Sequence, residues 1–132
     1  MCGAVKLAAR GVSEQASACH CDMCRRWSSG PFLAVMVQTL DVVEGEAATV
    51  GSSAWAERGF CPRCGSSLFY RITADGPHHG VTTVAYGALD DPSGIQVTTE
   101  WFHDRKPGGY ALAGDTKQIT EAQAMAMFAG DG

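Results

Sequence analysis

Cys19-His20-Cys21-Asp22-Met23-Cys24 is a six-residue stretch in which every second or third position is a cysteine. Thiolates this close repel one another unless a cation holds them, and zinc suits the task because it is tetrahedral, redox-inert and tolerant of sulfur. Three ligands from one loop leave a fourth position unfilled locally, which is typical of a reactive rather than a purely structural metal site. The stretch therefore predicts an open, catalytic zinc site at Cys19, Cys21 and Cys24.

A second cluster, Cys61-Pro62-Arg63-Cys64-Gly65, has the spacing of a zinc knuckle. Gly65 is expected to supply the positive φ that such a turn needs. A thioredoxin-like redox pair has the same spacing, but a long helix should then follow, whereas the residues after Cys64 indicate a strand. Cys2 is the predicted third ligand, because the first strand is expected to run beside the strand that carries the knuckle. A histidine, a water molecule or the N-terminal region remains open as the fourth.

Composition and charge limit the classes of function. The net charge is -4 and no block of Lys or Arg occurs, so we expect neither nucleic acid nor a membrane as partner. Residues 1–10 lack the apolar core of an export signal, which favours a cytoplasmic location where thiols stay reduced. The six cysteines therefore suit one or two zinc ions better than three disulfides. Iron, held as in a rubredoxin-type knuckle, is the alternative metal.

The hydrophobic pattern predicts one mainly β domain, residues 1–132, built largely from antiparallel strands. The predicted strands are 5–10, 32–37, 41–46, a return strand at 47–50, 68–72, 81–86 and 96–102. Residues 32–37 are apolar throughout, which predicts a strand buried on both faces. Residues 12–18 and 51–57 are predicted connections, and 25–27 a short helical turn after the metal loop.

The C-terminal segment is the one stretch that predicts a helix of several turns, at about residues 120–129. Thr120 and Gln123 have the spacing of a capping box, and the residues that follow are strong helix formers or apolar. Met125 and Met127 indicate packing or a contact in a homodimer.

Basic and aromatic residues near the clusters supply further candidates. Arg25 and Arg26 adjoin the anionic metal loop and could attract a carboxylate-bearing thiol, or only offset charge in solvent. His20 lies between two ligands, so alternation should point its side chain away from the metal. His103 is the reserve ligand, and Trp27 is expected in the core or in a pocket wall.

Several pieces of the chain, taken together, resemble the family of glutathione-dependent formaldehyde-activating enzymes, which includes the centromere-protein-V-like proteins. The resemblance covers the chain to about residue 115, and its two most specific pieces are the two cysteine clusters with their flanking residues. The matching pieces are Cys2 to Val5, Cys19 to Arg26, Glu44 to Glu46, Arg58 to Leu68, Gly87 to Pro92 and, more weakly, Trp101 to Tyr110.

The resemblance implies an Mss4-like fold, a folded antiparallel sheet with two zinc knuckles. It implies a catalytic zinc at Cys19, Cys21 and Cys24 and a structural zinc at Cys61, Cys64 and a Cys-x-Cys pair near the N-terminus, of which Cys2 matches the second member. The implied enzyme is a carbon–sulfur lyase that condenses glutathione, or another small thiol, with formaldehyde to S-hydroxymethylglutathione. A non-catalytic zinc module that binds a small thiol or a partner protein is the alternative.

Overall fold

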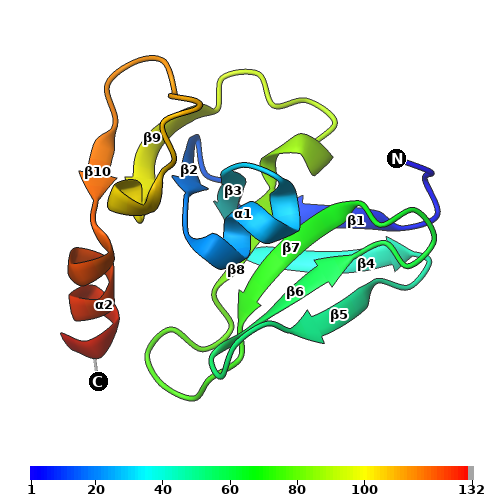
Figure 1. The fold of residues 1–132 in the computed structure, drawn as a ribbon. Coiled ribbons are helices and arrows are strands. Elements are labelled where there is room, and N and C mark those ends of the chain that lie inside the picture. The colour runs from blue at the N-terminus through cyan, green and yellow to red at the C-terminus, as the bar shows by residue number, and fades with distance from the viewer. Residues whose placement is uncertain (131–132) are drawn as a thin grey trace.

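The computed structural model describes residues 1–130 as a mainly β fold with short helices at its periphery (Figure 1); residues 131 and 132 of the predicted domain lie outside the described residues. The elements in chain order are β1 Lys6–Arg10, β2 Gln15–Cys19, α1 Asp22–Ser28, β3 Phe32–Val37, β4 Thr39–Glu44, β5 Ala48–Gly51, β6 Ala56–Phe60, β7 Ser67–Ile72, β8 Thr82–Ala85, the 3-10 turn η1 Tyr86–Ala88, β9 Gln96–Trp101, the 3-10 turn η2 His103–Arg105, β10 Lys117–Ile119 and α2 Glu121–Gly130.

Eight strands form one mixed sheet in the order β10-β9-β2-β3-β8-β7-β6-β5, and β1 pairs with β4 in a separate two-stranded sheet. The predicted β-rich, folded-sheet class is therefore confirmed, with two parallel pairs, β2–β9 and β9–β10, at one end of an otherwise antiparallel sheet. The predicted return strand 47–50 exists as β5, but it pairs with β6 while β4 pairs with β1. The partners β1 and β4 are far apart in sequence, so their pairing is fixed by packing that local pattern does not contain.

The sequence-based prediction missed three strands, β6, β10 and β2. Residues 51–57, expected as a connection, include the start of β6, and residues 12–18, expected as a polar connection, contain most of β2. Ala16 and Ala18 alternate with polar neighbours and are 2% and 0% exposed, which is the pattern of a strand with one buried face. Alanine and serine have weak strand preference, so the alternation carries little signal. The strand lies between β3 and β9, and its last residue is Cys19.

The central core lies where β2, β3 and β8 meet, and it consists of Ala16, Val35, Val37 and Val84. Strand β3 was expected to be buried on both faces, and this is wrong at Met36, which is 57% exposed. Its sequence neighbours Val35 and Val37 lie on the other face of the strand and point into the core, so β3 has one buried face at this end.

The β6–β7 hairpin carries the second cysteine cluster and has a bulge at its tip. The register shifts between Gly59 and Phe60, and the ring of Phe69 lies over the Gly59 backbone. A Cβ at Gly59 would lie 2.2 Å from that ring, so only glycine permits the contact. Gly65 has a φ of 80°, as the knuckle spacing predicted.

The C-terminal helix α2 begins where the capping box predicted. The Gln123 backbone N–H donates to Thr120 Oγ1 at 3.2 Å, and the Thr120 N–H donates to Gln123 Oε1 at 2.9 Å. Among the described residues, neither α-helix has the length and apolar character required to cross a membrane.

Candidate metal centres and the groove beside them

The end of β2 and the start of α1 bring Cys19, Cys21 and Cys24 together. Their sulfur atoms all lie within 4.8 Å of one another. Helix α1 begins at Asp22, inside the cluster and earlier than the predicted turn at 25–27, because Cys21 caps it: its sulfur accepts the Cys24 backbone N–H at 3.3 Å. The end of β2 and the start of α1 thus hold the three sulfurs close together.

The three sulfurs cannot all ionise without a cation. Hydrogen bonds donated by the Cys19 and Cys24 thiols lower the pKa of Cys21 to about 2. The hydrogen bonds that Cys19 makes to Cys21 and Cys24, together with its burial, raise the pKa of Cys19. Without a metal, one of the three cysteines is therefore a thiolate that accepts hydrogen bonds from the other two thiols. A soft divalent cation would displace the two remaining protons. This donor set fits zinc.

Arg58 contacts this sulfur cluster from β6, and it was not among the predicted site residues. Its Nη1 and Nη2 lie 3.6 and 3.5 Å from Cys24 Sγ. The guanidinium lowers the pKa of Cys21 further, after the larger effect of the neighbouring thiols. Arg58 is 34 positions from Cys24, so no local pattern could have indicated the contact.

His20 points away from the sulfurs, as alternation along the loop predicted. It is fully buried, with Nε2 2.8 Å from Glu100 Oε1 and Nδ1 2.9 Å from the Tyr110 hydroxyl. Burial lowers the pKa of His20, so the neutral ring donates from Nε2 to Glu100 and accepts the Tyr110 hydroxyl at Nδ1. These bonds hold the middle of the metal loop against β9.

The reserve ligand His103 stands outside the sulfur cluster. It packs edge-on against His20, with ring centroids 6.2 Å apart, and within residues 1–130 no histidine joins either cysteine group.

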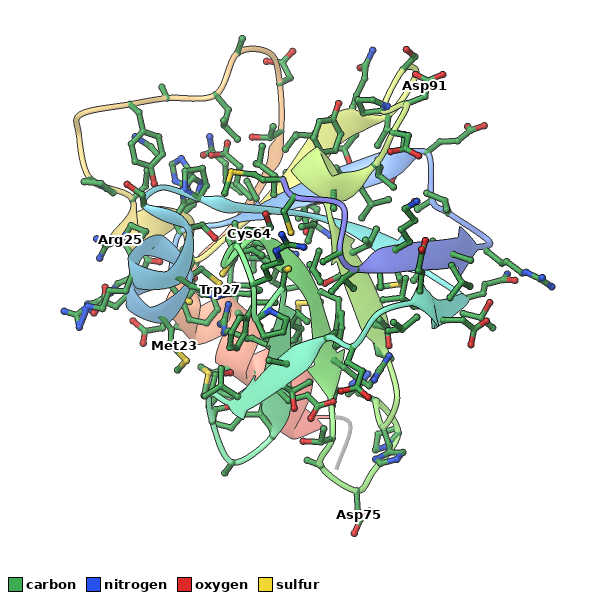
Figure 2. The ribbon with its side chains drawn as sticks, turned by 90° about the vertical axis from the view of Figure 1, so that its right-hand side faces the viewer. Met23, Arg25, Trp27, Cys64, Asp75 and Asp91 are labelled. Atoms are coloured by element: carbon green, nitrogen blue, oxygen red, sulfur yellow. The ribbon has the colours of Figure 1, made fainter. Side chains whose placement is uncertain are left out.

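Arg25 and Arg26 differ in availability. The Arg25 guanidinium donates to Asp22 Oδ1 at 2.5 Å and to the His20 carbonyl at 3.1 Å. Arg26 is exposed. Figure 2 shows Trp27 on the sheet side of α1 and Arg25 on the other side. Of the two predicted carboxylate-binding residues, Arg26 is therefore the one more available to a carboxylate from solvent.

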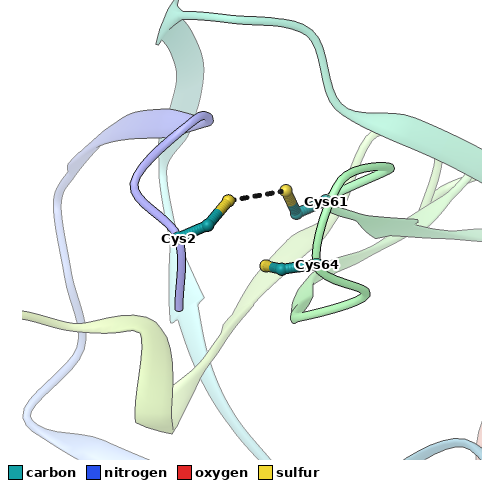
Figure 3. Close-up of side chains that lie close together, drawn as sticks. All are labelled: Cys2, Cys61 and Cys64. Carbon is teal, nitrogen blue, oxygen red and sulfur yellow. Dashed lines mark hydrogen bonds between the residues drawn. The ribbon is translucent and has the colours of Figure 1, made fainter.

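The second cluster unites Cys2, Cys61 and Cys64, whose side chains point toward one another (Figure 3). The Cys2 and Cys61 sulfurs are 3.8 Å apart, far beyond disulfide length and close to the edge of about 3.8 Å of a tetrahedron with zinc–sulfur bonds of about 2.3 Å. All six cysteines are free of disulfides.

Cys2 reaches the second cluster by a route other than the one predicted. The first strand, β1, runs beside β4 and not beside the strands of the knuckle, and the segment before β1 brings Cys2 to Cys61. The Ser66 hydroxyl, 3.1 Å from Cys64 Sγ, lowers the pKa of Cys64 to about 5.

A groove of about 620 Å³ separates the end of α1 from the knuckle and from η1. Its wall includes Trp27 and Phe32, which also pack against Cys24 in the core. Ser28 lines it with a buried hydroxyl that has no hydrogen-bond partner. The groove is therefore connected to the first sulfur cluster through Trp27 and Phe32, and it offers aromatic surface.

The chain is similar to a known protein family, to a named relative and to a solved structure. The family model described as glutathione-dependent formaldehyde-activating enzyme matches residues 1–105. A protein of Schizosaccharomyces pombe named only as an uncharacterized lyase is 31% identical over 127 residues, which cover 95% of this chain and 90% of that protein. A crystal structure of a Rhodobacter sphaeroides protein matches with a TM-score of 0.55 at 23% identity over 76% of this chain and 94% of that chain, which supports the fold.

Proposed function

Since the chain belongs to the family of glutathione-dependent formaldehyde-activating enzymes, we propose that it condenses a small thiol, glutathione by family resemblance, with formaldehyde. The reaction joins the thiol sulfur to the carbonyl carbon. The carbonyl π electrons pass to oxygen, which takes up one proton while the thiol loses one, so that R–SH and H₂C=O give R–S–CH₂–OH. No oxidant or reductant is needed.

The observation that carries the proposal is the open cysteine trio. Cys19, Cys21 and Cys24 would hold zinc and offer three sulfurs where a closed site needs four donors. When bound, the metal supplies Lewis acidity at an open position, either to a thiol or to an aldehyde oxygen. Cys2, Cys61 and Cys64 would hold a second zinc, with a structural role at the tip of the hairpin.

The chain's own residues would bind and orient the substrate. We place the body of the thiol against the Trp27 wall of the groove of about 620 Å³, because Trp27 also packs against Cys24 of the trio. Arg26 would attract a carboxylate of the thiol from solvent. Holding the two reactants side by side contributes through proximity.

The test is the rate of adduct formation from ¹³C-formaldehyde and glutathione, followed by NMR, with and without protein. Wild type should accelerate the reaction over the spontaneous rate, and Cys21→Ser should not. Met23→Ser is the matched control, because Met23 lies between Cys21 and Cys24 in the first turn of α1, is 40% exposed and supplies no ligand. No acceleration by wild type would remove the catalytic proposal, and thiol binding without acceleration would favour the non-catalytic module.

A further inference from the structure

The Arg58 guanidinium is buried without a carboxylate. The residue is 5% exposed, and among the residues that the structure describes no Asp or Glu lies within ion-pair distance of it. Its Cζ lies 5.0 Å from the Trp27 ring centre and 5.2 Å from that of Tyr70. Both rings thus contact the cation, and its Nε is buried without a hydrogen-bond partner.

A buried guanidinium needs an anion nearby. The cost of removing its charge from water exceeds what ring faces return, so an unpaired buried arginine is rare. The group available to Arg58 is Cys24, which would be an anion as a metal-bound thiolate and whose sulfur faces two of its N–H groups at 3.6 and 3.5 Å. The fold therefore positions one permanent positive charge against one sulfur of the trio.

The charges of the centre match this arrangement. A divalent metal with three thiolates has one net negative charge, and one guanidinium cancels it. An anionic fourth ligand, such as a thiolate, would otherwise approach a centre that is already negative. Hydrogen bonds to a ligating sulfur also withdraw electron density from it, which leaves the metal a better acceptor.

We propose that Arg58 is a specificity-determining residue of the cysteine trio: it offsets the negative charge of the three sulfurs so that the open position prefers an anionic sulfur to a neutral donor. The inference rests on the metal-holding part of the proposed function and not on catalysis. Arg25 and Arg26 do not supply this charge at the sulfurs, because Arg25 donates to Asp22 and His20 and Arg26 is exposed.

The test is a ligand titration of the cobalt-loaded protein, with visible absorption as the readout. 2-Mercaptoethanol serves as the anionic ligand, since it lacks carboxylates that Arg26 could bind, and its S–H proton passes to the buffer on binding. Imidazole serves as the neutral ligand. The variants are Arg58→Met, which removes the charge, and Arg58→Lys, which keeps the charge but loses the planar fork.

Arg71→Met is the matched control. Arg71 lies on the neighbouring strand β7, its Cζ is 4.8 Å from the Phe69 ring centre, and its Nη1 is 3.6 Å from Glu57 Oε1. It resembles Arg58 in its ring contact but does not contact the cysteine trio. Its variant should therefore keep the wild-type affinity for both ligands within about threefold.

Arg58→Met should weaken 2-mercaptoethanol binding by about 10- to 100-fold and change imidazole binding by less than about threefold. Arg58→Lys should lie between wild type and Arg58→Met, and it decides the question if Arg58→Met does not fold. Equal loss of both ligands, or no loss of the thiol, would overturn the inference. An intact ligand preference without rate acceleration would refute only the catalytic proposal.

Discussion

Replacing His20 with phenylalanine is expected to destabilise the protein more than almost any other single change outside the hydrophobic core. His20 is 0% exposed and Glu100 4%, and the 2.8 Å bond between them is one of two side-chain bonds to that carboxylate. Phenylalanine fills the space but leaves the Glu100 carboxylate partly unpaired in a buried position. The loss should be about 3 kcal/mol, which corresponds to a fall of roughly 10 °C in Tm for a domain of this size.

A double-mutant cycle with Glu100→Gln isolates the interaction. Urea unfolding of the metal-free, reduced proteins, followed by circular dichroism, should give a coupling energy between positions 20 and 100 of about 1.5–3 kcal/mol. The matched control is His79→Phe, an exposed histidine, which should cost less than about 1 kcal/mol. Additive effects at 20 and 100, with coupling below about 0.5 kcal/mol, would refute the reasoning.

Three other changes have outcomes that the structure predicts. Gly59→Ala should lower the unfolding free energy by about 1–3 kcal/mol, since the new Cβ would lie 2.2 Å from the Phe69 ring. Gly108→Ala is the control, because no atom lies within 4 Å of its new Cβ. Equal losses in the two variants would contradict the close contact between Gly59 and Phe69. Thr120→Ala removes the cap of α2 and should cost about 0.5–2 kcal/mol in thermal unfolding; a smaller loss would mean that the cap is not formed. Burial holds the pKa of His20 below its ordinary value of 6.5, so below that pH the unfolded chain binds a proton that the folded protein does not. The free energy of unfolding should therefore fall as pH falls from 6.5 to 5.5, by up to about 1.4 kcal/mol per pH unit. His20→Phe should flatten this slope, and an unchanged slope would exclude His20 as its origin.

Cysteine spacing made the first trio and the Cys61–Cys64 pair predictable, because a short loop keeps its sulfurs close whatever the rest of the chain does. Cys2 joins that pair from 59 positions away, so its place depends on the fold. The capping box at Thr120 and the positive φ of Gly65 are local in the same way. Each is determined by a few neighbouring residues, so sequence alone contains the information.

The surroundings of the first trio depend on contacts between distant segments. Glu100 meets His20 from 80 positions away, and Arg58 meets Cys24 from 34. The order of the strands in the sheet brings both pairs of residues into contact. Sequence adjacency instead favoured Arg25 and Arg26, whose place on a short helix leaves one engaged with Asp22 and the other exposed.

X-ray absorption at the zinc edge would count the sulfurs bound to a zinc ion at the first trio and so show whether one coordination position is open to a thiol. The sample is the Cys2→Ser/Cys64→Ser protein, which retains only the first trio, measured with and without glutathione. We expect three sulfurs at about 2.3 Å and one lighter atom around zinc without the thiol, and four sulfurs with it. Four protein donors without glutathione, unchanged when the thiol is added, would contradict this expectation.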